Sequence, residues 1–139
     1  MKGMRYYNSI WYKITKPFKR LWFRKLLKED RMIYVDYRHR GIGKTFMLID
    51  RAIEIGAPIL VGNITALKNI KRNGNPVEVI LVKKGECIPY ARRTFKNGVL
   101  IDESLNPRCI VEMRAKGVEV RGGFIGDYGA SLEGEPFDF

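Results

Sequence analysis

Two short groups of residues in this sequence have the types and the order that phosphate chemistry requires. The first is Gly43-Lys44-Thr45. A glycine lets backbone N–H groups turn toward phosphate oxygens, a lysine ammonium neutralises terminal phosphates, and a threonine hydroxyl can bind Mg²⁺. The second is Asp102-Glu103, which follows the apolar run Gly98–Ile101. Together the two groups predict a site for a nucleotide and Mg²⁺.

The loop that leads into Lys44 is expected to cradle the phosphates. Its backbone N–H groups, from Arg40 through Gly41, Ile42 and Gly43 to Thr45, precede an apolar helix whose N-terminus adds partial positive charge. The spacing matches the second half of the pattern G-x-x-x-x-G-K-[ST]. Arg38 stands where that pattern has its first glycine. His39 lies in the same loop and could contact phosphate or face solvent.

The two carboxylates have separate expected roles. Asp102 would hold Mg²⁺ together with Thr45, and Glu103 would orient or deprotonate the attacking water or hydroxyl group. The simpler alternative is a strand that ends in a polar turn before a helix cap at Asn106. The presence of both groups in one chain favours the nucleotide site. Arginines that could complete it, within the chain or from a neighbouring subunit of a homo-oligomer, are Arg92, Arg93, Arg108 and Arg121.

The elements that must position these residues alternate between strand and helix. The patterns predict strands over 32–35, 58–62, 77–82, 98–101 and 118–125, and helices over 45–55, 64–72 and 107–116. This order predicts an α/β fold with a mainly parallel sheet of about five strands flanked by helices. Ligands of such sheets bind at the carboxyl ends of the strands, where Lys44 and Asp102 both fall. Gly122-Gly123 is expected to weaken the last strand.

Composition limits the class of protein. The chain has 139 residues, 45% of them hydrophobic and 29% charged, an ordinary balance for one globular domain. The net charge of +11 favours anionic partners such as nucleic acid, acidic lipid or nucleotide. Cys87 and Cys109 have no close second thiol, which is typical of reduced cysteines in a cytoplasmic protein. No apolar run reaches the length that spans a bilayer.

The chain divides by composition into three parts. Residues 1–30 are a basic, aromatic and amphipathic segment, 31–126 form the expected core, and 127–139 are acidic and rich in glycine. The last part is either a flexible tail or a loop folded over the site.

The N-terminal segment is expected to form two helices, a short one after Asn8-Ser9 and a second that Pro17 opens. On the second helix Phe18, Trp22 and Leu26 lie in one line, with Phe23 and Leu27 beside it. The basic residues of a separate line are Arg20, Arg24 and Lys28. Three interpretations stay open, in this order: the apolar line covers the sheet, the basic and aromatic residues bind nucleic acid, or the helix lies on an anionic membrane.

The Gly-Lys-Thr loop and the Asp-Glu strand together resemble P-loop NTPases of the branch that keeps a glutamate beside the magnesium aspartate. Within that branch the C-terminal third is similar to type II thymidine kinases. The similar residues are Lys116-Gly117-Val118-Glu119-Val120, Gly126-Asp127-Tyr128 and Glu133-Gly134-Glu135-Pro136-Phe137. We expect no zinc-binding lasso of the kind with which those kinases enclose the nucleoside. The resemblance implies an ATP- or GTP-dependent and Mg²⁺-dependent enzyme in which Lys44 and Thr45 bind phosphate and metal and Glu103 is the base.

Other functions remain compatible with the same residues. One is a nucleoside kinase of the thymidine-kinase type. Another is a nucleic-acid-associated ATPase, because Arg38-His39-Arg40 resembles the loops of viral packaging ATPases; a small viral or mobile-element protein in the host cytoplasm would fit that function. A third is a binding protein that is gated by nucleotide and has no turnover.

Overall fold

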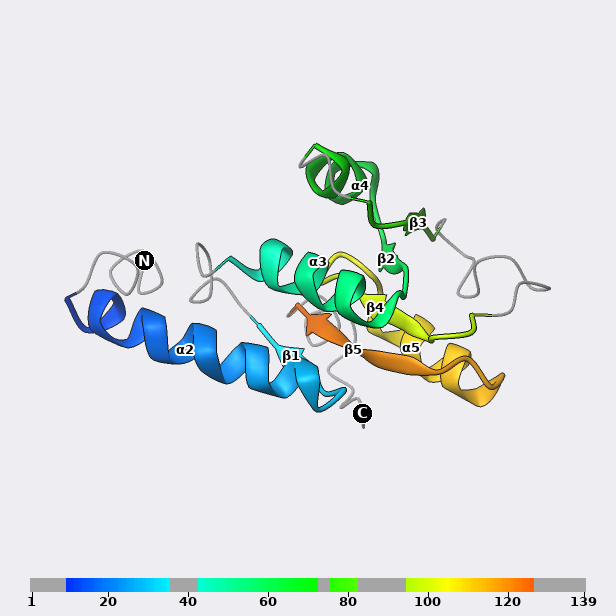
Figure 1. Ribbon diagram of the computed structural model, residues 1–139. Coiled ribbons are helices and arrows are strands. Elements are labelled where there is room, and N and C mark those ends of the chain that lie inside the picture. The colour runs from blue at the N-terminus through cyan, green and yellow to red at the C-terminus, as the bar shows by residue number, and fades with distance from the viewer. Residues whose placement is uncertain (1–9, 36–42, 73–75, 83–94, 127–139) are drawn as a thin grey trace.

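The computed structural model describes residues 10–35, 43–72, 76–82 and 95–126. Along the chain, helices and strands alternate, and Figure 1 shows them in one α/β unit. The elements are α2 (Ile10–Lys28), β1 (Met32–Tyr34), α3 (Lys44–Ile55), β2 (Ile59–Val61), α4 (Ile64–Lys71), β3 (Val79–Leu81), β4 (Val99–Ile101), α5 (Pro107–Ala115) and β5 (Val120–Ile125). Each strand and helix predicted after residue 31 is therefore present, and the strands are shorter than predicted.

The five strands form one parallel sheet in the order β1-β5-β4-β2-β3. The predicted α/β fold with a parallel sheet is thus confirmed. Local sequence patterns could not predict the strand order. In this sheet β5, the last strand in the sequence, lies between β1 and β4. As a result, the strand that precedes Lys44 and the strand that precedes Asp102 are separated by one strand.

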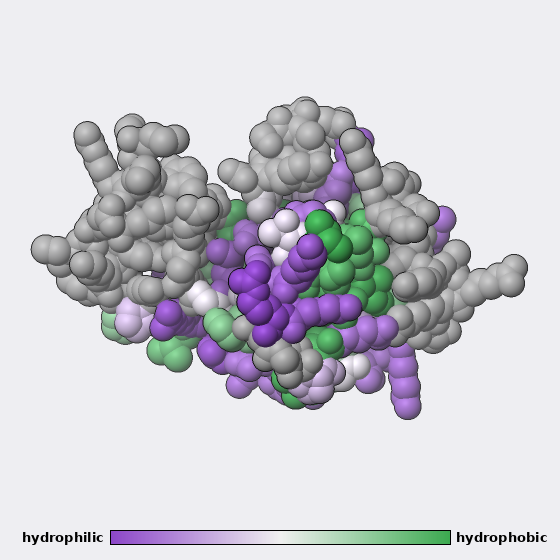
Figure 2. Space-filling view, turned by 90° about the horizontal axis from the view of Figure 1, so that it is seen from above, coloured by the Kyte–Doolittle hydropathy of each residue, from purple (hydrophilic) through white to green (hydrophobic). Residues whose placement is uncertain are grey.

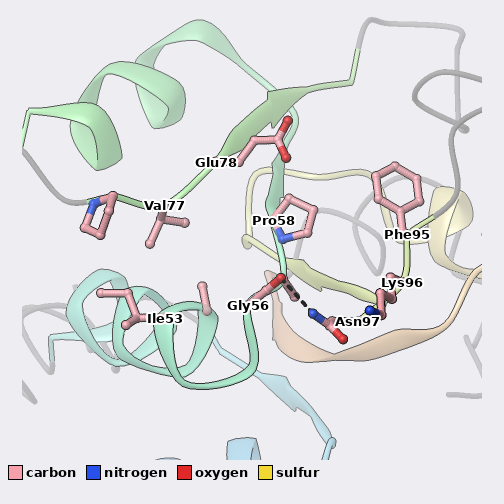
Figure 3. Close-up of a pocket in the computed structure, with 12 residues that line it drawn as sticks. Ile53, Gly56, Pro58, Val77, Glu78, Phe95, Lys96 and Asn97 are labelled. Carbon is pink, nitrogen blue, oxygen red and sulfur yellow. Dashed lines mark hydrogen bonds between the residues drawn. The ribbon is translucent and has the colours of Figure 1, made fainter.

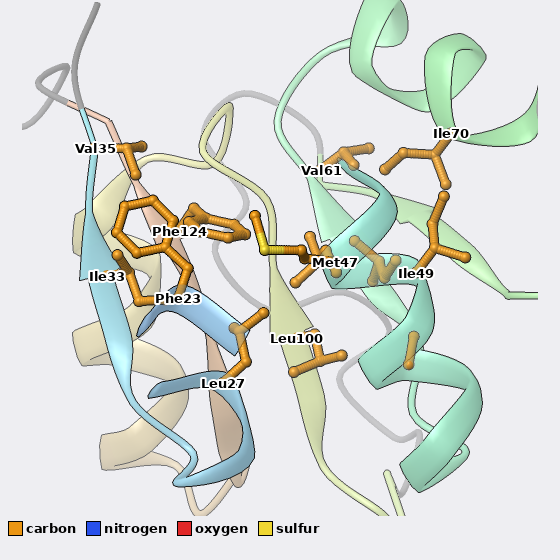
Figure 4. Packing of buried hydrophobic residues seen from close by; sticks show 13 residues of the cluster. Phe23, Leu27, Ile33, Val35, Met47, Ile49, Val61, Ile70, Leu100 and Phe124 are labelled. Carbon is orange, nitrogen blue, oxygen red and sulfur yellow. The ribbon is translucent and has the colours of Figure 1, made fainter. Parts of the chain in front are cut away.

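Helices cover both faces of this sheet. On one face, α2 and α3 pack against the sheet together with part of α4, and the cluster includes Leu27, Met47, Ile70 and Phe124 (Figure 4). On the other face α5 contributes Ile110 to a second cluster. The strands supply both clusters by alternation. In β2, for example, Leu60 belongs to the second cluster while its two neighbours belong to the first.

The ends of the helices follow the sequence signals. Asn63 caps α4, since its side-chain oxygen accepts a hydrogen bond from the Ala66 N–H at 2.8 Å. Asn106 caps α5, with Pro107 as its first residue. Gly56 ends α3 in a left-handed conformation, as expected. Seen from above, hydrophilic side chains gather in the middle of the described surface (Figure 2). Lys68 and Lys71 of α4 and its C-cap residue Arg72 are exposed.

The prediction of two N-terminal helices is wrong. A single helix, α2, runs from Ile10 to Lys28 and contains Pro17 in its interior. Proline already has a helical φ, and it removes only one backbone hydrogen bond of the nineteen-residue helix. Tertiary packing of the C-terminal half of α2 helps to offset that loss.

The interpretation that the apolar side of this helix covers the sheet holds for part of that side only. The buried side chains of α2 are Phe23 and Leu27, which are 6% and 2% exposed, and the Phe23 ring lies 5.9 Å from that of Phe124. Phe18 and Trp22, by contrast, are exposed. The sequence pattern alone could not distinguish the two lines, because both are apolar and lie on different sides of the same helix.

Gly122-Gly123 lets β5 approach the neighbouring backbone closely. Both residues are buried inside the strand, and a Cβ atom at Gly123 would lie 2.1 Å from the Ile101 carbonyl oxygen. The ladder between β4 and β5 shifts register at this point. Glycine at 123, with φ of 141°, therefore permits the close approach of the two strands.

A charged network fixes the end of α2 to the core. The Asp30 carboxylate accepts hydrogen bonds from Arg51 at 3.0 Å and from Arg121 at 2.9 Å. Arg51, 8% exposed within α3, also donates to Glu54 at 2.7 Å and to the Lys28 carbonyl at 3.4 Å. The network ties α2, α3 and β5 together beneath the amino end of β1.

Candidate functional site

Of the predicted site residues that the structure describes, Lys44, Thr45, Asp102 and Glu103 lie at the carboxyl edge of the sheet. Lys44 and Thr45 are the first two residues of α3, and both side chains are partly buried. Gly43 stands before them in a left-handed conformation, φ 89°, which glycine adopts readily. The Gly43 carbonyl accepts the hydrogen bond of the Met47 N–H at 3.1 Å, so the helix begins directly at the lysine. The N-terminus of α3 is therefore placed as the sequence predicts.

The structure brings the two predicted halves of the site into contact. Lys44 Nζ lies 3.8 Å from Glu103 Oε1, and the lysine side chain is 14% exposed whereas that of the glutamate is 45% exposed. The two residues follow β1 and β4, which are not neighbours in the sheet. The strand between them is β5, which ends at Ile125. An ammonium group and a carboxylate thus face each other across the carboxyl end of one strand.

Asp102 is oriented by a residue that the sequence analysis did not identify. Its Oδ2 atom accepts hydrogen bonds from Ser104 N–H at 3.0 Å and from Ser104 Oγ–H at 2.6 Å. Ser104 Oγ in turn accepts a hydrogen bond from the Gly62 N–H at 2.9 Å. Ser104 therefore connects the loop after β4 to the end of β2.

A signal for this role was present in the spacing. Aspartate and serine two residues apart commonly form local side-chain to backbone bonds at turns. Both hydrogen bonds go to one carboxylate oxygen, Oδ2, so that Oδ1 is the atom that could face a metal-bound water. The link to Gly62 could not be predicted, because it depends on β2 and β4 being neighbours.

Several predicted residues lie outside the described part of the chain. These are Arg38, His39, Arg40, Gly41 and Ile42 of the loop, the arginines Arg92 and Arg93, and Cys87. Of the remaining arginines, Arg108 is exposed near the start of α5, at the same edge as Asp102. Arg121 lies near the amino end of β5 and binds Asp30, so within this chain it belongs to the opposite edge. Cys109 is a buried free thiol, as expected.

The protein groups that could hold Mg²⁺ here are few. Within the four described ranges no group of three or more His, Cys, Asp or Glu residues could hold a metal ion by itself. Magnesium bound with a nucleotide does not need such a group, because phosphate oxygens and waters fill most of its positions. Thr45 offers a hydroxyl and Asp102 an oriented carboxylate, which are the donor types that such a site takes from the protein.

A separate cleft lies at the opposite edge of the sheet. It has a volume of about 440 Å³ and is lined near the amino ends of β2, β3 and β4. The side chains that surround it include those of Ile53, Val77, Glu78 and Phe95 (Figure 3). Beside it, Asn97 Nδ2 donates a hydrogen bond to the Gly56 carbonyl at 3.3 Å. It contains none of the predicted site residues. Ligands of parallel α/β sheets bind at the carboxyl ends of the strands, which favours the Lys44 edge.

Comparisons with known proteins give no further identification. No protein-family model, no curated protein and no solved structure matches this chain. The assignment of a function therefore depends on the fold and on the geometry at the Lys44 edge.

Proposed function

We propose that this protein binds ATP or GTP with Mg²⁺ and cleaves or transfers the terminal phosphate. The observation that carries the proposal is the 3.8 Å approach of Lys44 Nζ to Glu103 Oε1. Two strands that are not adjacent in the sheet deliver these groups to one place, at the edge where parallel α/β sheets bind ligands.

Each side chain has a definite task in this proposal. Backbone N–H groups at the start of α3 and Lys44 bind and neutralise the phosphates. Thr45 and Asp102 would hold Mg²⁺, which would neutralise charge that develops on the phosphate oxygens. Ser104 keeps the Asp102 carboxylate in one orientation through its two hydrogen bonds. A carboxylate fixed before the nucleotide arrives needs less reorganisation during the reaction.

Glu103 is the proposed base. Its side chain is about half exposed, so that water or an acceptor hydroxyl can reach it. At neutral pH a carboxylate can accept a proton from the attacking oxygen while Lys44 holds the phosphate. If water accepts the phosphate, the protein is an NTPase, and if the hydroxyl group of a nucleoside accepts it, the protein is a nucleoside kinase. The same groups serve either reaction.

The binding test compares wild type with Lys44→Ala. Wild type should bind a fluorescent ATP analogue in the presence of Mg²⁺, and Lys44→Ala should weaken binding by about a hundredfold, the effect of losing one charged phosphate contact. Lys71→Ala is a matched control, because Lys71 is an exposed lysine in α4. Circular dichroism establishes that all three proteins are folded. Equal affinity of Lys44→Ala and wild type would contradict the site.

A second experiment measures phosphate release from ATP and identifies the acceptor. Wild type and Lys44→Ala are assayed alone, with single-stranded DNA, and with a mixture of deoxynucleosides. Turnover that Lys44→Ala abolishes establishes the enzyme. Stimulation by DNA would indicate a nucleic-acid-associated ATPase, while consumption of ATP only with a deoxynucleoside would indicate a kinase. Nucleotide binding without turnover in any condition would leave a nucleotide-gated binding protein.

A further inference from the structure

Helix α2 carries a second apolar side that does not face the core. Phe18, Leu21 and Trp22 have relative exposures of 70%, 67% and 54%. They are spaced i, i+3 and i+4, which places them together on one side of the helix. With about 100° per residue, the buried Phe23 and Leu27 lie about 140° and 180° from Phe18. We call the three exposed residues the outer face of α2.

Basic side chains accompany this outer face. Over residues 17–28 the sequence contains five Lys or Arg residues and no Asp or Glu. Four of them are exposed, namely Arg20, Arg24, Lys25 and Lys28. Lys25 Nζ lies 5.4 Å from the centre of the Trp22 ring, and Arg24 makes an exposed ion pair with Asp50 at 3.3 Å. A partner that matches this face must therefore have an apolar interior and anionic groups at its surface.

The outer face is held in position by the rest of the protein. Leu27 and Phe23 are packed in the core, and Arg51 donates a hydrogen bond to the Lys28 carbonyl at 3.4 Å. Because the C-terminal half of the helix is fixed from within, Phe18, Leu21 and Trp22 cannot turn inward without losing those contacts. Their exposure is a consequence of the way α2 packs.

We propose that the outer face of α2 binds the surface of an anionic lipid bilayer. Phe18, Leu21 and Trp22 enter the boundary between head groups and acyl chains, and the flanking lysines and arginines bind anionic head groups. Long basic side chains suit this arrangement, since their aliphatic stems cover apolar surface while their charged ends stay in water. The helix lies on the bilayer; in the described chain no helix is long and apolar enough to cross one.

A nucleic acid fits this face less well. Nucleic-acid surfaces place basic side chains against phosphates and use aromatic rings for stacking on bases. Here one of the three residues, Leu21, is aliphatic and cannot stack on a base, whereas the lipid boundary accepts all three.

The test uses the full chain and sedimentation with lipid vesicles. One set of vesicles is pure phosphatidylcholine, and the other contains a minority of phosphatidylserine. Wild type should sediment with the anionic vesicles and much less with the neutral ones, and high salt should release it. The triple variant Phe18→Ser, Leu21→Ser, Trp22→Ser should bind anionic vesicles at least about tenfold more weakly, because burial of apolar side chains contributes to interfacial affinity. Charge reversal at Arg20 and Lys25 should have a similar effect.

The matched control is Ile64→Ser with Val111→Ser. Both are exposed apolar residues, at 51% and 48%, in α4 and α5. The control should bind vesicles like wild type, and thermal unfolding should show that every variant remains folded.

Three results would overturn the proposal. The first is no binding to anionic vesicles, or binding that the triple variant retains. The second is binding of single-stranded DNA through the same residues without vesicle binding, which would identify a nucleic-acid surface instead. The third is loss of self-association in the triple variant without vesicle binding, which would identify an interface between two copies of the chain. Each outcome is independent of whether the Lys44 site hydrolyses nucleotide.

Discussion

Lys44 at the start of α3 and Glu103 after β4 are joined by a 3.8 Å approach of Nζ to Oε1. The distance is too long for a strong hydrogen bond, and the glutamate side chain is 45% exposed, so the pair contributes little to stability. Its importance is positional. Because the two groups are this close, an entering phosphate can take the place of Glu103 beside the Lys44 ammonium group.

The first prediction concerns Glu103→Gln. If phosphate competes with Glu103 for Lys44, removal of the carboxylate charge should leave nucleotide affinity unchanged or raise it by about two- to fivefold, the scale of an exposed ion pair. Phosphate release should fall by about a hundredfold or more, since the proposed base is lost. Fluorescence titration and a phosphate-release assay measure the two quantities. Glu112→Gln, an exposed glutamate in α5, serves as the control. Undiminished turnover in Glu103→Gln would remove the glutamate from the reaction.

The second prediction concerns Ser104→Ala. The substitution leaves the Gly62 N–H without its 2.9 Å acceptor and removes the hydroxyl that donates to Asp102. The free energy of unfolding should fall by about 1–2 kcal/mol, the cost of a partly buried hydrogen-bonded group. Urea unfolding measures it. Thr65→Ala, an exposed hydroxyl in α4, should change stability by less than about 0.5 kcal/mol. Equal stability of Ser104→Ala and wild type would mean that the Ser104 bridge does not hold β2 to the loop after β4.

The third prediction concerns the network around Asp30. Asp30→Asn removes the charge that Arg51 and Arg121 share, while asparagine tolerates the left-handed backbone at this residue, φ 59°. The free energy of unfolding should fall by about 1–2 kcal/mol, because Arg51 is nearly buried and keeps only its other contacts.

The control for this variant is Asp50→Asn, which breaks the exposed Arg24–Asp50 pair. That change should cost less than about 0.5 kcal/mol. If the two variants lose stability equally, burial of Arg51 does not strengthen the network.

The fourth prediction distinguishes two reasons for glycine at a position: a backbone with positive φ, and a lack of space for a Cβ atom. In Gly123→Ala the new methyl group would lie 2.1 Å from the Ile101 carbonyl oxygen, and β4 and β5 would have to separate. The expected loss of stability exceeds about 3 kcal/mol. Gly117→Ala has a similar left-handed backbone, φ 86°, but open space around the added atom, so it should cost only about 1 kcal/mol. Thermal unfolding compares them, and a Gly123→Ala protein as stable as Gly117→Ala would contradict the close approach.

Much of the fold could be predicted because it follows from local patterns. Asn63, Asn106 and Gly56 mark helix ends by bonds to atoms a few residues away, which any sequence window contains. The strands were recognised as short apolar runs, although their limits depend on where neighbouring strands end. The reason for glycine at 123 could not be predicted, because it is the backbone of β4, a strand some twenty residues earlier.

The N-terminal helix shows the same limit. Its apolar and basic character could be read from the sequence, but two of its sides are apolar. Only packing against Ile33 and Phe124 decides that Phe23 and Leu27 are buried and that Phe18 and Trp22 remain exposed.

The sequence by itself determined the chemistry of the candidate site: a lysine and a threonine at a helix N-terminus, and two carboxylates after a buried strand. These follow from residue type and local order. The tertiary structure decided that the lysine and the second carboxylate meet, because the order β1-β5-β4 is set by long-range packing. It also introduced Ser104 and Gly62, whose contact exists only because β2 and β4 lie side by side.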